Sequence, residues 1–218
     1  VTVAAGATLT LAAGVEVYTS NYNYEILVDG GLVVDGVVFS GYHSEIQVRS
    51  GGQADLSNCQ WPDSNVLLRA YAEARLDVSG GILGGSSGQI VYYSGSEGSV
   101  AGSDLGNNIL TVQSDLVAVS ASSMDQFVVS SGSMPTIESL MLTGTVPAAV
   151  HAGYLGRALA HCTFDRSGEA QTIHIYSGTV ESDVIWNLTG DVTGYQLGGD
   201  VTVAAGATLT LAAGVEVY

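Results

Sequence analysis

The chain has 218 residues, 46% of them hydrophobic, which is enough to bury a sizeable core, and nothing requires more than one domain. The chain has 21 acidic residues and five basic ones, all of them Arg, so its net charge is -16. Because no stretch of basic residues offsets this charge, the sequence excludes nucleic-acid binding. No apolar run approaches the roughly 20 residues that span a bilayer. Gly, Val, Thr, Ser and Leu dominate, a composition typical of an all-β protein with tight turns.

The segment VTVAAGATLTLAAGVEVY occupies residues 1–18 and recurs without a change at 201–218. Nothing in this segment carries chemistry: it has no Ser, Cys, His or Lys and a single Glu. Its ATLTL stretch at 7–11 is predicted to be a strand, because β-branched and apolar residues alternate there. The meaning of the repetition depends on the pattern between the two copies.

A short phrase then recurs along the chain: an apolar residue, a polar or small stretch, and a large apolar residue five positions on. It occurs as VDGVVF (34–39), LSNCQW (56–61), VSGGIL (78–83), VAGSDL (100–105), VSASSM (119–124), IESLML (137–142), LAHCTF (159–164) and VESDVI (180–185). Successive phrases start 22, 22, 22, 19, 18, 22 and 21 residues apart. A repeat of about 22 residues with three β-prone runs fits one coil of a parallel β-helix.

Alternate residues of a strand point to the same face, so the first residue of each phrase, such as Val34, is predicted to line the interior with the residue two before it, Leu32. The large residue that ends each phrase is predicted to re-enter the core after a corner. Small residues between them, such as Asp35-Gly36, turn the backbone at a corner. The predicted core ladder comprises Val34, Phe39, Leu56, Trp61, Val78, Leu83, Val100, Leu105, Val119, Met124, Ile137, Leu142, Leu159, Phe164, Val180 and Ile185.

The lead-in segment, the run EILVDGGLVVDGVVFSG and the phrases SNCQW and AHCTF resemble right-handed parallel β-helix repeats of secreted bacterial surface and adhesin-type proteins, which have a pectate-lyase-like fold. The resemblance covers nearly the whole chain but concerns pattern. Adhesins, autotransporter passenger domains and polysaccharide-cleaving enzymes share it, so it implies a fold more than an activity. The expected fold is a single-stranded right-handed parallel β-helix, its hand following the general preference of parallel crossovers.

The repeated segment is expected to be in phase with the ladder. Leu9 and Leu11 precede Leu32 and Val34 by 23 residues, and the 31 residues from Val180 to Leu211 are expected to form one long coil with an excursion at 187–200. About nine coils then make a unit of residues 1–200, and residues 201–218 begin the next, identical unit. The predicted head-to-tail continuation uses Val1, Val3, Leu9, Leu11, Val201, Val203, Leu209 and Leu211.

Few residues are candidates for chemistry. His161, Asp165 and Arg166, with Glu138 from the adjacent coil, form the best candidate for acid–base catalysis, although one coil with one His is weak evidence. His43, His151 and His174 lack metal-ligand spacing, and no metal site is expected. Loosely bound Ca²⁺ at turn aspartates is the only cofactor considered; the candidates are Asp63, Asp104, Asp115, Asp125 and Asp191.

The remaining candidates concern cysteines and surface groups. Cys59 and Cys162 lie in equivalent positions about five coils apart, too far for a disulfide, and are expected to be buried or corner thiols. A sugar or a neighbouring fibre could stack on exposed tyrosines: Tyr18, Tyr22, Tyr24, Tyr92 and Tyr93. Asn187 begins a glycosylation sequon.

Two function classes follow from this pattern. The first is a non-enzymatic structural module of an extracellular or cell-surface filament, stalk or adhesin-like fibre, with further copies of the same unit as end-to-end partners and cell-surface glycans as possible ligands. The second is a β-helix that binds or cleaves polysaccharides. An uncapped solenoid end pairs with any strand it meets, which favours the first class.

Overall fold

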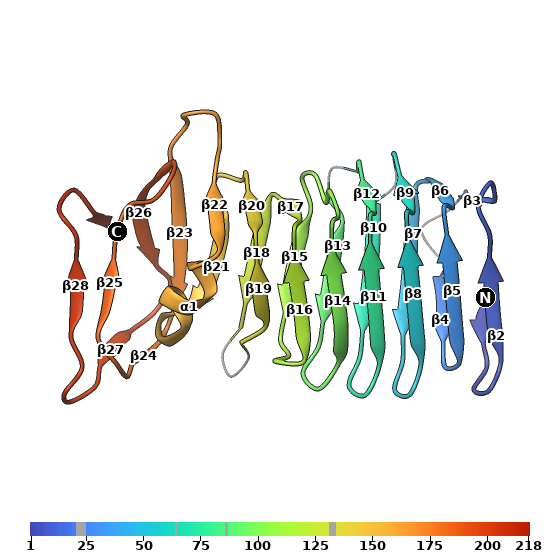
Figure 1. Cartoon of the computed structure of the whole chain (residues 1–218), viewed down its shortest axis with the longest axis horizontal. Coiled ribbons are helices and arrows are strands. Elements are labelled where there is room, and N and C mark those ends of the chain that lie inside the picture. The colour runs from blue at the N-terminus through green and yellow to red at the C-terminus, as the bar shows by residue number, and fades with distance from the viewer. Residues whose placement is uncertain (21–24, 64, 86, 131–133) are drawn as a thin grey trace.

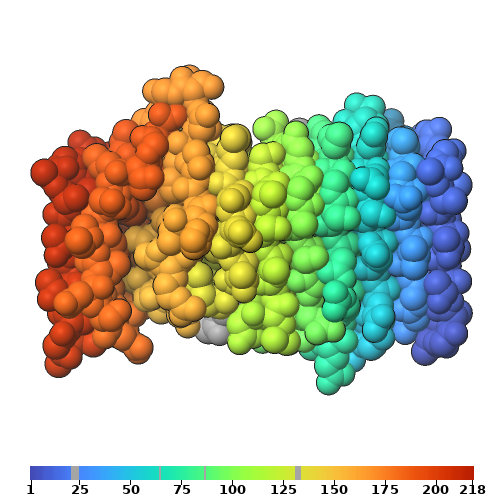
Figure 2. Space-filling model, viewed as in Figure 1, coloured from blue at the N-terminus to red at the C-terminus, as the bar shows by residue number. Residues whose placement is uncertain are grey.

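The computed structural model describes residues 1–20, 25–63, 65–85, 87–130 and 134–218. It is a parallel β-solenoid of about nine turns, roughly 22 residues apart. The coils stack along the long axis, with the N-terminal and C-terminal segments at opposite ends (Figure 1). The space-filling view shows an elongated body in which successive coils form bands across that axis (Figure 2).

The longest sheet, which we name face A, contains eleven parallel strands stacked in chain order. These strands are β1 (Thr2–Val3), β4 (Glu25–Val28), β7 (His43–Val48), β10 (Asn65–Ala70), β13 (Gln89–Tyr92), β15 (Ile109–Val112), β18 (Gln126–Val129), β21 (Ala148–His151), β23 (Gln171–Tyr176), β26 (Val192–Leu197) and β29 (Glu216–Val217). In β7, β10, β15 and β18 the residues alternate between buried and partly exposed, because one side of the sheet lines the core.

The second sheet, face B, has seven parallel strands. They are β2 (Thr8–Leu11), β5 (Gly31–Asp35), β8 (Gln53–Ser57), β11 (Arg75–Ser79), β14 (Glu97–Ala101), β16 (Val117–Ser120) and β19 (Thr136–Glu138). Face C consists of two short sheets, which are β3 (Glu16–Thr19), β6 (Val38–Gly41), β9 (Gln60–Trp61) and β12 (Ile82–Leu83), then β17 (Ser123–Met124), β20 (Leu140–Leu142) and β22 (Cys162–Phe164).

The regular coil changes after β21. A 3-10 helix, η1 (Ala152–Tyr154), and the helix α1 (Leu155–Leu159) stand where earlier coils carry a face B strand. Two separate strand pairs follow, β24 (Gly178–Val180) with β27 (Val201–Val203) and β25 (Val184–Trp186) with β28 (Leu209–Leu211). The last coils therefore run through β24 and β25, or β27 and β28, between successive face A strands.

The observed register agrees with the predicted spacing over most of the chain. Leu11 lies beside Val34, and the ladder continues through Leu56, Val78, Val100, Val119 and Ile137 as direct Cα partners. Fourteen predicted ladder residues are at most 7% exposed, namely Val34, Phe39, Leu56, Trp61, Val78, Leu83, Val100, Leu105, Val119, Met124, Ile137, Leu142, Phe164 and Val180. Side chains also stack from coil to coil: the rings of Phe39 and Trp61 are 5.0 Å apart and nearly parallel.

Of the other two predicted ladder residues, Leu159 packs against the core only in part and Ile185 is wrong. Leu159 is the last residue of α1 and only partly buried, because Ala152, Leu155 and Ala158 fill the core at helical spacing instead. Ile185 is 63% exposed, and the inward residue of β25 is its neighbour Trp186, at 2%. A slip of one residue in a strand moves every side chain to the opposite face, which explains the reversal.

The expected phase of the second copy is also wrong in detail. Val180 pairs with Val203, and Leu211 pairs with Trp186, rather than Val180 with Leu211. The stretch 187–200 is not a simple excursion, because it contains β26, a full strand of face A. An extra passage through face A therefore lies within the interval that the sequence pattern assigned to one long coil.

Candidate functional site

The two copies of the repeated segment form the first and last coils of the solenoid. The first copy contributes β1, β2 and β3, and the second contributes β27, β28 and β29. All six are terminal strands of their sheets. Each copy therefore has one edge paired with the body of the solenoid and the other edge unpaired within the described chain.

The turns within the two copies have the same geometry. In the first turn, the amide of Ala7 donates to the carbonyl of Ala4 at 3.0 Å, and Ala207 donates to Ala204 at 3.0 Å. The second turn closes at 3.2 Å in both copies, from Val15 to Ala12 and from Val215 to Ala212. Each turn contains a glycine with φ between 77° and 88°, a conformation that side-chain-bearing residues rarely adopt: Gly6, Gly14, Gly206 and Gly214. The segment thus folds alike at both ends.

The two copies differ in which edge is paired. The first copy is held on its following edge, where β1 pairs with β4, β2 with β5 and β3 with β6. The second copy is held on its preceding edge, where β27 pairs with β24, β28 with β25 and β29 with β26. One sequence therefore pairs through opposite edges at the two ends of the molecule.

The predicted continuation residues lie at these ends with different degrees of burial. Val3 is buried, and Leu9, Leu11, Val201 and Leu209 are partly buried against the core. Others remain open to solvent, with Val1 79%, Val203 42% and Leu211 48% exposed. The first and last coils of the described chain thus carry apolar side chains beside strand edges that have no partner within it.

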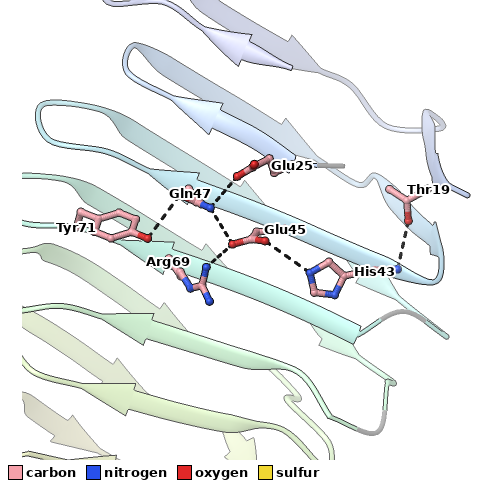
Figure 3. A network of polar contacts seen from close by, with 7 residues as sticks. All are labelled: Thr19, Glu25, His43, Glu45, Gln47, Arg69 and Tyr71. Carbon is pink, nitrogen blue, oxygen red and sulfur yellow. Dashed lines mark hydrogen bonds and ion pairs between the residues drawn. The ribbon is translucent and has the colours of Figure 1, made fainter. Parts of the chain in front are cut away.

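A polar cluster lies on the outer side of face A near the N-terminal end (Figure 3). Glu25 and Glu45 are Cα partners on β4 and β7, so two like charges stand side by side. The Nε2 of Gln47 donates to both carboxylates, at 2.7 and 2.9 Å, and the guanidinium of Arg69 bonds Glu45. These donors offset the repulsion and link three successive coils.

The cluster extends to both sides. The Nε2 of His43 lies 3.7 Å from the Glu45 carboxylate, and its backbone amide donates to Thr19. Tyr71 donates to the side-chain oxygen of Gln47 at 3.5 Å, and its ring stacks on that of Tyr93 at 5.0 Å. The sequence singled out Tyr93 and His43 separately, but their common neighbourhood became visible only through the register of face A.

The predicted catalytic candidates do not form a joint site. His161 is exposed in the turn after α1, and no hydrogen bond or ion pair within the described chain joins it to Asp165, Arg166 or Glu138. Arg166 pairs instead with Glu169 at 2.8 Å. Acid–base catalysis needs its groups within hydrogen-bond reach of one another or of one substrate atom. The arrangement therefore gives no support to a catalytic site here.

The other predicted groups have local roles. His151 accepts a hydrogen bond from the amide of Gly153 at the start of η1, and the His174 ring lies 5.1 Å from that of Tyr176. Tyr92, predicted to be a surface stacking residue, is buried and donates to the carbonyls of Leu76 and Ser99. Tyr18 is 67% exposed. Tyr22 and Tyr24 lie outside the described residues.

Two of the turn aspartates, Asp104 and Asp191, accept hydrogen bonds from backbone amides. The Asp191 carboxylate accepts from the amides of Arg166, at 2.6 Å, and Gly168, at 3.0 Å, and these bonds lower its pKa. Asp104 accepts from Ser123 and from the amide of Gly106. In the described part of the chain, no group of three or more His, Cys, Asp or Glu is placed to hold a metal ion. Weak Ca²⁺ binding at Asp63, Asp104, Asp115, Asp125 or Asp191 stays a prediction.

Both cysteines are free thiols. Each lies two residues before the large core residue of face C, Cys59 before Trp61 and Cys162 before Phe164. Desolvation raises the pKa of Cys59 to about 11 and that of Cys162 to about 12. The absence of a disulfide between them agrees with the prediction from their separation.

Comparisons with known proteins identify no relative. No family model, curated protein or solved structure matches the chain. Among the described residues, no helix is long and apolar enough to cross a membrane.

Proposed function

We propose that the protein is a structural repeat module of an extracellular or cell-surface fibre, such as a filament, stalk or adhesin. Units are joined head to tail through continuous solenoid coils, and the role is mechanical rather than enzymatic. The observation that carries this proposal is the repeated segment, which has the same turns at both ends of the solenoid but is paired through opposite edges.

The physical argument concerns the cost of open ends. A solenoid gains stability from contacts between neighbouring coils, so a terminal coil lacks half of its stabilising interface. A further unit would cover apolar residues such as Val203 and Leu211 and pair the free strand edges. The net charge of -16 favours solubility of the resulting fibre, since like-charged fibres repel each other laterally.

Electron microscopy of the chain, alone and as a tandem of units, tests this proposal. We expect rods of constant width whose length increases by about 45 Å per unit, because nine coil steps at about 4.8 Å separate β1 from β26 and the counterpart of β1, β27, lies about a third of a coil further on. Compact particles that neither lengthen in tandem nor associate end to end would contradict a filament role.

Polysaccharide binding is the second candidate, and one observation favours it. The stacked rings of Tyr71 and Tyr93 adjoin Gln47 and Arg69, so an aromatic surface lies beside hydrogen-bonding groups on face A. A glycan array with the native chain, compared with Tyr71→Ala, tests this role. Retention on acidic or neutral polysaccharides that the variant loses would support it, and equal signals from both chains would remove it.

A further inference from the structure

The two copies of the repeated segment each show half of one joint. In the first copy the structure displays what pairs with the following edge of the segment, and in the second copy what pairs with its preceding edge. Because sequence and turns are identical, both sets of partners fit a single segment at once. We infer that residues 201–218 are a joint coil, whose open edge accepts β4, β5 and β6 of a second copy.

This inference rests on the proposed function and specifies its joint, strand by strand. β27 has the sequence of β1, so its free edge would take the second copy's β4; β28 would likewise take β5, and β29 would take β6. Thr202 would then lie beside Leu27 of the second copy, since Thr2 lies beside Leu27 within the chain. Thr210 would lie beside the second copy's Val33, as Thr10 does.

The joint has an unexpected consequence for the sheets. β29 belongs to face A of its own unit, but its first-copy counterpart β3 belongs to face C. Face A of one unit would therefore continue into face C of the next. Face A of the next unit would begin on the β24–β27 pair, because β27 corresponds to β1.

Successive face A sheets would thus not lie in line along a fibre. The polar cluster around Glu45 and Arg69 lies on the outer side of face A in each unit, so it would shift by one sheet at every joint. Copies of the cluster would wind around the fibre instead of forming a single charged stripe.

Disulfide cross-linking in a two-unit chain tests the joint. The chain is lengthened by appending residues 19–218 after Tyr218, so that one repeated segment lies between two units. One variant combines Thr202→Cys in the first unit with Leu27→Cys in the second; the matched control combines Glu216→Cys with the same Leu27→Cys. Adjacent parallel strands place partner Cα atoms about 4.8 Å apart, within the range of a disulfide.

We expect oxidation to cross-link the Thr202–Leu27 variant nearly completely and the Glu216 variant only at background level. A Thr179→Cys/Thr202→Cys variant of the first unit reports the other edge of the same strand and should cross-link as completely, whereas a segment paired on one edge only would cross-link just one of the two Thr202 pairs. The native thiols are buried or partly buried, and the unmodified two-unit chain gives that background. Cross-linking through Glu216 instead would mean that face A continues directly into face A, and would overturn the inference. If neither pair forms although the chain is a single rod of doubled length, the joint is wrong and the filament proposal survives. Two rods without a continuous joint would remove both.

Discussion

Replacing Trp186 tests whether Trp186, as the structure shows, or Ile185, as the sequence pattern predicts, is the buried residue of β25. Trp186 is 2% exposed, its ring lies 5.2 Å from that of Tyr195, and it is the Cα partner of Leu211 in the repeated segment. Removing a buried Trp side chain costs about 3–5 kcal/mol, of which the ring contact accounts for about 0.5–1.5 kcal/mol. Trp186→Ala should therefore remove a large share of a typical domain stability of about 5–15 kcal/mol.

Ile185→Ala is the matched control, because its side chain is 63% exposed and adjacent in the same strand. It should cost about 1 kcal/mol or less, mainly through lower strand propensity. Urea unfolding followed by far-ultraviolet circular dichroism measures both variants, and Trp186→Phe should recover much of the loss. Equal costs for the two alanine variants, or a larger cost for Ile185→Ala, would refute the assignment of the inward residue.

Three further predictions concern other parts of the chain. Gly98→Ala should lower the free energy of unfolding by several times the roughly 1–2 kcal/mol expected for Gly102→Ala, as measured by thermal unfolding. Both glycines have positive φ, but of the two only Gly98 would place an added Cβ 1.9 Å from a backbone oxygen. Similar costs for the two variants would contradict this close approach. The pKa of the Asp191 carboxyl is lowered in the folded chain, so this group stabilises the fold above its ordinary pKa and loses that effect as the pH falls through the lowered value. The difference in Tm between wild type and Asp191→Asn should therefore shrink between about pH 7 and about pH 3. A difference in Tm that stays constant over this range would refute the assignment. Cys59 and Cys162 should resist alkylation at about pH 8 while folded and react together in denaturant, because burial raises both pKa values; rapid labelling of either folded thiol would disagree.

The ladder from Leu11 to Ile137 could be predicted because each coil there repeats one phrase with nearly constant spacing. Inward residues such as Leu56 and Val78 are both apolar and in period, so the pattern and the pairing coincide. The repeated phrase failed to predict the inward residues where the coil no longer has a strand on face B or where its strand is shifted by one residue. The phrase beginning at Leu159 was expected to start on a strand, but Leu159 is the last residue of α1 and the strand β22 begins only at Cys162.

The site was less predictable than the fold. The sequence showed that residues 1–18 and 201–218 are identical, but it could not show which edge each copy leaves open, since that depends on pairing with residues far along the chain. The polar cluster illustrates the same limit. Glu25, Gln47 and Arg69 are separated by about one coil each in sequence, and only the parallel register brings them together.

The most direct test of the joint between units is electron cryomicroscopy of the two-unit chain. The account predicts one uninterrupted solenoid in which residues 201–218 are paired on both edges, with β24, β25 and β26 on one side and the second unit's β4, β5 and β6 on the other. Two separate solenoids, with the repeated segment paired on one edge only, would contradict the central claim.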